Sequence, residues 1–188
     1  MAIVKIDTVG DFFVGQGDVI IFDEIANYAA AKLSTLANPK SVGDVHLDST
    51  NFTGDAPAIN PLQNEQGQAY YTTVTEGTFG FEIFIPSTSE EMIGEFLMGE
   101  KIEDTFIGDN GFASGTTAIG AMHKSASQER PIMIVNDKKN RALVVPKAMI
   151  VASPSMQDKV SGILVSVTAQ KLDTASLKTL VWTKGKIE

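Results

Sequence analysis

Apolar and polar residues alternate along much of the chain, and alternation with a period of two predicts β-strands. One face of segment 78–85 is apolar and carries Phe79, Phe81, Ile83 and Ile85. In segment 162–170 the apolar face carries Ile163, Val165, Val167 and Ala169, and the other face carries Leu164, Ser166, Thr168 and Gln170. One buried face and one wetter face are typical of antiparallel sheets. We therefore expect a mainly β fold built as an antiparallel β-sandwich.

Segment 131–151 predicts a β-hairpin. Its two apolar strands run from Ile132 to Val135 and from Ala142 to Val145, and the polar stretch 136–140 forms the turn between them. Pro146 has no N–H to donate to a ladder, so it should mark an edge, a bulge or a break between strands. The strand should then continue from Ala148 to Ala152.

Segment 86–100 predicts one flanking α-helix. Ser87 and Glu90 have the spacing of a capping box, and Gly99 is placed to end the helix. We expect Glu95 to point to water. The apolar stripe that should pack on the sheet consists of Met92, Ile93, Phe96 and Leu97.

Three further segments lack a clear period. Segment 23–37 is rich in alanine but has a narrow apolar stripe, and we interpret it as a second helical candidate. Segment 49–69 is rich in Pro, Gly and Asn, and segment 108–128 is rich in small residues, so we expect two long extended loops. Apolar side chains in or beside these loops are Phe52, Ile59, Leu62, Tyr70, Tyr71, Phe112 and Ile119. They pack either on a partner or on their own domain.

Length and charge narrow the picture further. The 188 residues are 43% hydrophobic, which suffices for a single domain over residues 1–188 that buries roughly 70% of its unfolded surface. The net charge of -8 disfavours a surface that neutralises DNA phosphates. Residues 1–80 carry -7, residues 81–120 carry -7 and residues 121–188 carry +6. This asymmetry fits either a salt-bridged monomer or head-to-tail self-association.

Candidates for chemistry are few. The chain has no cysteine, which excludes disulfides, thiolate nucleophiles and cysteine-rich metal sites. It has only two histidines. Asp44, His46 and Asp48 share one face of an expected strand, a spacing that suits either a metal or a solvated strand face. Gly15 and Gly17 precede a β-like run rather than a helix, so they do not match a dinucleotide-binding fingerprint. We expect no enzyme activity, no catalytic residues, no metal and no cofactor.

The order of the expected elements is distinctive. A glycine-flanked strand and an acidic strand lead through a long irregular connection to a strand-to-helix unit, a hairpin and a closing strand. These elements read GQGDVIIF, VGDVHLDS, segment 49–69, TFGFEIFIPSTSEEMIGEFLMGE, PIMIVNDKKNRALVVPKAMIVA and DKVSGILVSVTAQ. This order resembles the major tail tube proteins of tailed bacteriophages, whose shared fold is a β-sandwich with a flanking helix and a long extended loop. The resemblance covers residues 15–184 and rests on element order, since the family has no short diagnostic motif.

The resemblance implies a structural protein of the virion tail, made and assembled in the cytoplasm of a host bacterium. Subunits of this family form hexameric rings that stack into a hollow tube, with tape-measure and tail-tip or terminator proteins as partners. DNA passes through the lumen without specific binding, and no membrane is involved. An acidic lining would repel DNA phosphates, and its candidates, each expected on a strand face, are Asp44, Asp48, Glu76 and Glu82. The loop at 49–69 is expected to reach a neighbouring subunit.

Three other readings stay open. A tube subunit of a bacterial injection system would share this architecture. A ligand-binding β-sandwich, such as a carbohydrate-binding domain, would share the strand pattern and would use Trp182 and the three tyrosines as stacking platforms. A metal-dependent enzyme would be centred on Asp44, His46 and Asp48.

Overall fold

A computed structural model describes residues 18–42, 45, 51–102, 118–120, 126–136, 141–172 and 178–184. Its main sheet contains β1 (Asp18–Ile21), β2 (Lys40–Ser41), β3 (Asn51–Thr53), β6 (Gly80–Ile85), β9 (Ala126–Asn136), β10 (Arg141–Gln157), β11 (Val160–Ala169) and β12 (Val181–Lys184). Two small sheets are formed by β4 (Ala58–Gln63) with β5 (Ala69–Thr75), and by β7 (Glu100–Ile102) with β8 (Ala118–Gly120). The helices are α1 (Glu90–Leu97) and two 3-10 helices, η1 (Tyr28–Ala30) and η2 (Leu33–Thr35). None of the helices described is long and apolar enough to cross a membrane.

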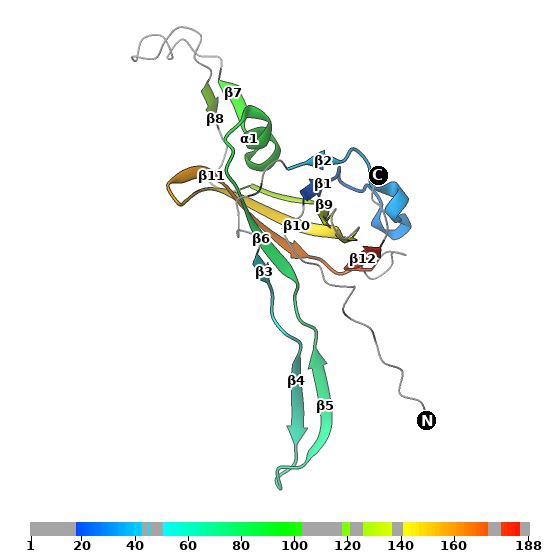
Figure 1. The fold of residues 1–188 in the computed structure, drawn as a ribbon. Coiled ribbons are helices and arrows are strands. Elements are labelled where there is room, and N and C mark those ends of the chain that lie inside the picture. The colour runs from blue at the N-terminus through cyan, green and yellow to red at the C-terminus, as the bar shows by residue number, and fades with distance from the viewer. Residues whose placement is uncertain are drawn as a thin grey trace.

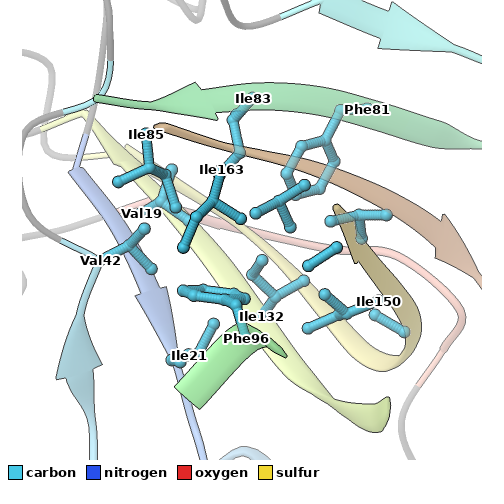
Figure 2. Close-up of a cluster of buried hydrophobic side chains, with 14 of the residues drawn as sticks. Val19, Ile21, Val42, Phe81, Ile83, Ile85, Phe96, Ile132, Ile150 and Ile163 are labelled. Carbon is cyan, nitrogen blue, oxygen red and sulfur yellow. The ribbon is translucent and has the colours of Figure 1, made fainter. Parts of the chain in front are cut away.

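The main sheet is antiparallel throughout, in the order β2-β1-β9-β10-β11-β6-β3, with β12 paired to β10. The predicted mainly β, antiparallel fold with one short α-helix is therefore confirmed, and the sheet of this single chain is not closed into a barrel among the strands described. Strands far apart in the order, such as β1 and β6, nevertheless share one hydrophobic core. In Figure 2, Phe81, Ile83 and Ile85 of β6 point into the same cluster as Val19 and Ile21 of β1. The sheet therefore curls around its core.

The alternating patterns correctly identified the core face. Phe81, Ile83 and Ile85 on β6 are all fully buried, as are Ile163 and Val165 on β11. The predicted hairpin is also confirmed, because β9 pairs with β10 from the Asn136–Arg141 pair to the Ile132–Val145 pair. On β11, burial of one face forces an apolar residue at every second position. At Phe84 of β6 and from Ala142 to Val145 of β10 both faces are buried, and there a continuous apolar run reveals the strand.

Pro146 lies at a bulge in β10. Val145 pairs with Ile132 and Ala148 pairs with Arg130, so Pro146 and Lys147 together oppose a single residue of β9. The extra residue shifts the alternation by one position, and Val145 and Ala148 both face the core as a result. The structure thus selects the bulge among the three outcomes expected for this proline.

Helix α1 covers the core, and Phe96 projects from it into the cluster (Figure 2). Phe96 and Leu97 are buried, whereas Met92 and Ile93 are partly buried and pack against the same core, so the expected stripe is confirmed. The expected start is wrong: the N-cap is Ser89, whose Oγ accepts from the Met92 N–H. Glu90 is then the first helical residue, and a capping box with Ser87 is impossible.

The end of α1 also differs from expectation. The left-handed position is occupied by Met98, with φ of 53°, rather than by Gly99. The N–H groups of Met98 and Gly99 both donate to the Ile93 carbonyl, from Gly99 at 3.1 Å, and these bonds close the last turn of the helix. Met98 therefore adopts a backbone conformation that normally favours glycine.

The alanine-rich segment 23–37 does not form the predicted α-helix. It contains only η1 and η2, and Ala31 is its one fully buried residue. The Asn27 side chain accepts from the Ala29 N–H at 3.0 Å, and the Asp23 N–H donates to the Ala37 carbonyl at 3.1 Å. Without a wide apolar stripe to bury, helix propensity alone does not stabilise a long helix here.

The two segments expected to be loops contain strands. Segment 49–69 holds β3 and β4, and Pro61 lies within β4, opposite Thr72. All of β4 is exposed on both faces, so burial imposes no alternation that the sequence could show. In segment 108–128, β8 and the first residues of β9 are strands, whereas Phe112 lies outside the described residues.

Candidate assembly surfaces

A hairpin formed by β4 and β5 extends away from the main sheet, and we call residues 54–78 the arm (Figure 1). Four large apolar side chains on the arm are exposed: Ile59 by 68%, Val74 by 64%, Tyr71 by 58% and Leu62 by 50%. None of these belongs to the hydrophobic core. A two-stranded hairpin alone in water is marginally stable, so an arm of this kind gains most from a partner.

Both faces of the arm carry an apolar pair. Ile59 lies opposite Val74, and Leu62 lies opposite Tyr71. Directly opposed residues project from the same face, and positions 59 and 62 differ by an odd number of residues. The two pairs therefore lie on opposite faces, with the pair Leu62 and Tyr71 closer to the tip. Tyr70, which was also expected to contact a neighbour, lies in β5.

The tip of the arm is ordered by one asparagine. The Asn64 side-chain oxygen accepts from the N–H groups of Gln66 and Gln68 at 3.0 and 2.9 Å. Gly67 has φ of +75° and donates its N–H to the Asn64 carbonyl at 2.9 Å. This turn closes the hairpin without help from the rest of the molecule.

The base of the arm is closely packed backbone. A Cβ on Gly54, whose φ is +136°, would lie 2.3 Å from the Thr78 carbonyl oxygen, and only glycine allows so close an approach. Asp55 and Thr78 are joined by two hydrogen bonds, from the Asp55 N–H to the Thr78 Oγ1 at 3.0 Å and from the Thr78 N–H to the Asp55 carbonyl at 3.1 Å. These contacts fix where the arm leaves the sheet.

Phe52 anchors the base from the sheet side. The centre of its ring lies 5.7 Å from the centre of the Phe79 ring and 6.5 Å from that of the Phe81 ring, yet Phe52 is 50% exposed. Of the loop residues expected to face a partner, Phe52 thus packs partly on its own domain. Ile59, Leu62 and Tyr71 do not.

The charge of the arm has one sign. It carries Asp55, Glu65 and Glu76 and no Lys or Arg. Glu76 lies just after the end of β5, so its expected place on a strand face is wrong, and its carboxylate is 3.5 Å from the Lys171 ammonium. Both side chains of this pair are well exposed, at 77% and 63%, so the pair adds little stability.

Glu82 lies on the face of β6 that points away from the core. It is half-buried and accepts a hydrogen bond from the Ser166 hydroxyl at 3.1 Å. The register continues this row across the sheet through Asn51, Glu82, Ser166, Val151 and Ser127. The row contains one carboxylate, three small polar side chains, the apolar Val151 and no base. Asp44 and Asp48, the other strand candidates for an acidic lining, lie outside the described residues.

The proposed metal ligands Asp44, His46 and Asp48 also lie outside the described residues. In the part of the chain that is described, no group of three His, Asp or Glu side chains is close enough to hold a metal ion. The metal alternative accordingly rests on the sequence alone.

A polar cluster ties α1 to the sheet. Arg130 on β9 is only 7% exposed and pairs with Glu95 of α1, while Lys40 of β2 reaches the other Glu95 oxygen at 2.9 Å. Arg130 also donates to the Phe22 carbonyl at 2.7 Å and to the Gln128 side-chain oxygen at 3.0 Å. The expectation that Glu95 points to water is wrong, because its carboxylate compensates a buried guanidinium. A lone Glu on a helix gave no sign of a partner 35 residues away.

Burial raises the pKa of Glu95, but hydrogen bonds and charge from Lys40 and Arg130 outweigh it and hold the pKa below its usual value. A second cluster joins segment 23–37 to the β10 bulge: the Lys147 ammonium lies 5.2 Å from the centre of the Tyr28 ring and 3.5 Å from Glu129. Burial, together with Glu129 and Glu24, raises the pKa of Tyr28 to about 12. Both clusters hold the body of the molecule together and leave the arm untouched.

No protein-family model matches the chain, and the search of curated proteins finds no match. The functional argument therefore rests on the geometry of the arm, the charge distribution and the order of the elements.

Proposed function

We propose that this protein is a structural subunit that assembles with copies of itself into stacked hexameric rings, forming the hollow tail tube of a bacteriophage. The observation that carries the proposal is the arm, which presents four large apolar side chains to solvent on a hairpin held apart from the core. Monomeric proteins rarely keep such surfaces uncovered. The element order that resembles tail tube proteins supplies the architecture.

Charge supports contact between unlike surfaces. The arm is acidic throughout, whereas residues 121–188 carry a net charge of +6. A contact between two different surfaces is heterologous, and repeated heterologous contacts produce rings or filaments. Opposite charge on the two surfaces would guide the register of the copies.

The row that includes Glu82 suits a conduit for DNA. It carries one carboxylate, small polar side chains and one valine but no base, so it has no positive charge to neutralise phosphates. In the proposed tube, this face lines the lumen and DNA slides past it without binding. Tape-measure and tail-tip proteins would meet the tube at its lumen and its end.

The test removes the arm without disturbing its base. A Cβ on Gly77 would lie 2.2 Å from the Asp55 carbonyl oxygen, so the chain can be rejoined between residues 55 and 77 after deletion of residues 56–76. We expect wild-type protein to form rings or tubes in negative-stain electron microscopy, with a matching mass by light scattering. The deletion variant should stay a folded monomer, with an unchanged thermal transition.

Two outcomes would count against the proposal in different ways. Wild-type protein that stays monomeric at every concentration up to the millimolar range would contradict self-assembly. Tubes formed by the deletion variant would keep the tube but remove the arm from its assembly.

A further inference from the structure

We propose that the tip of the arm docks on the surface of β12 in a second copy of the chain, with Trp182 at the centre of the contact. This inference rests on the proposed self-assembly and names the surface that receives the arm. It requires one partner only, another copy of this chain.

The receiving surface combines an exposed aromatic with positive charge. Trp182 is 60% exposed although it lies opposite the fully buried Leu143 of β10. Among the described strands, β12 pairs only with β10, so its outer edge is not covered by another strand. Lys178, four residues before Trp182 in the chain, is exposed as well.

The arm tip carries the complementary set. Leu62 and Tyr71 share one face there, both at least half exposed, and Glu65 lies in the turn beyond them. Glu65 is thus the acid at the tip, and the exposed Lys178 is the base on the receiving side. The apolar and aromatic side chains supply buried area, and the charges orient the approach.

The contact must lie between copies. In Figure 1 the arm tip points away from the main sheet, and β12 lies against that sheet, far from the tip. The arm tip and the β12 surface are different patches, so each copy can give one and receive one. Such a contact propagates from copy to copy, as ring or tube assembly requires.

Two features of the sequence make a direct test possible. Trp182 is the only tryptophan and the chain has no cysteine, so one introduced cysteine can be labelled uniquely. Bimane is quenched by a tryptophan only at contact distance. We would place bimane on Thr73→Cys, which shares the face of Tyr71 and is exposed, in a chain that also carries Trp182→Phe.

This labelled chain is mixed with unlabelled wild-type protein, whose Trp182 is then the only tryptophan present. We expect bimane emission to fall as wild-type protein is added and to stay constant when unlabelled Trp182→Phe protein is added. The matched control carries bimane on Ser34→Cys, an exposed residue in η2, and should not be quenched. Trp182→Ala should raise the concentration needed for half-assembly roughly 30-fold, as expected for loss of an interface hot spot.

Charge reversal gives a second readout. Glu65→Lys and Lys178→Glu should each reduce quenching, and a mixture in which the labelled chain carries Glu65→Lys and the unlabelled chain carries Lys178→Glu should restore it. Restoration in this pairing is not expected from a structural defect in either chain.

The outcomes separate this inference from the proposed function. Assemblies that form without quenching at Thr73→Cys would overturn the docking of the arm on β12 and leave the tube intact. Equal quenching from Ser34→Cys would also overturn it, because the contact would not be specific. Absence of both assemblies and quenching would overturn both proposals together.

Discussion

Replacing Glu95 by alanine should destabilise the protein far more than its place on a surface helix suggests. The substitution removes the carboxylate that pairs with Arg130, whose side chain is only 9% exposed. Arg130 would keep the Phe22 carbonyl at 2.7 Å and the Gln128 oxygen at 3.0 Å, but its nearest remaining carboxylate, Asp23, is 3.9 Å away. The charge of the guanidinium would be left largely uncompensated.

The expected magnitude follows from burial. Breaking a fully buried ion pair by removing one partner costs about 3–5 kcal/mol. Glu95 is 22% exposed and Arg130 keeps two neutral acceptors, so we expect a loss of about 2 kcal/mol in the free energy of unfolding. Lys40→Ala is the matched control: Lys40 bonds the same carboxylate but is 50% exposed, so its loss should cost roughly 0.5 kcal/mol.

Urea unfolding followed by far-ultraviolet circular dichroism measures both values, at a concentration where the protein is monomeric. If the slope of the unfolding free energy against urea concentration is the same as in wild type, the variant exposes the same amount of surface on unfolding. The double variant Arg130→Met with Glu95→Leu should recover much of the loss, because it leaves no buried charge. If Glu95→Ala costs no more than Lys40→Ala, the reasoning about the buried guanidinium is refuted.

The same pair predicts a dependence on pH. The pKa of Glu95 lies below its usual value, so the folded state binds its proton less readily than the unfolded state does. Its contribution is complete above the unfolded-state pKa of about 4.3 and is lost as the pH falls through the lower folded-state pKa. The stability difference between wild type and Glu95→Gln should therefore shrink below about pH 4. A difference that stays constant down to pH 2 would contradict this account of Glu95.

Two further predictions concern the end of α1 and the proposed lumen. Met98→Gly should stabilise the protein by about 1 kcal/mol in thermal or urea unfolding, because the Met98 backbone is in the left-handed region and its side chain is 46% exposed. The control Met156→Gly, at an exposed position of β10, should give no such gain. A loss of stability in Met98→Gly would mean that its side-chain contacts outweigh the backbone strain. Glu82→Lys should leave assembly intact but make sedimented tubes retain duplex DNA in a salt-sensitive way. No retention would remove Glu82 from the lumen.

The sequence alone determined the elements that bury apolar side chains in the core. The sequence predicted the alternation on β6 and β11, the hairpin of β9 and β10, and the apolar stripe of α1. These could be predicted because burial selects the residue type at each inward position. Pro146 was readable as an irregularity for a covalent reason, since it lacks an N–H.

Tertiary structure decided what burial does not select locally. The strand β4 is exposed on both faces, so its pattern contains no period and segment 49–69 reads as a loop. The sequence predicted Ser87 as the cap of α1, whereas in the structure Ser89 begins the helix and accepts from the Met92 N–H. The alanine-rich segment 23–37 has helix propensity without a surface to bury, and packing left it as two short 3-10 helices.

The pairing of distant residues was beyond the sequence for the same reason. Arg130 and Glu95 lie on different elements, and neither charge carries a local sign of its partner. The arm likewise gains its separation from the core only when β3 and β6 pair and the backbone closes at Gly54 and Thr78. Local periodicity records which side chains are buried, whereas the meeting of charges and the projection of the arm depend on how the sheet curls around its core.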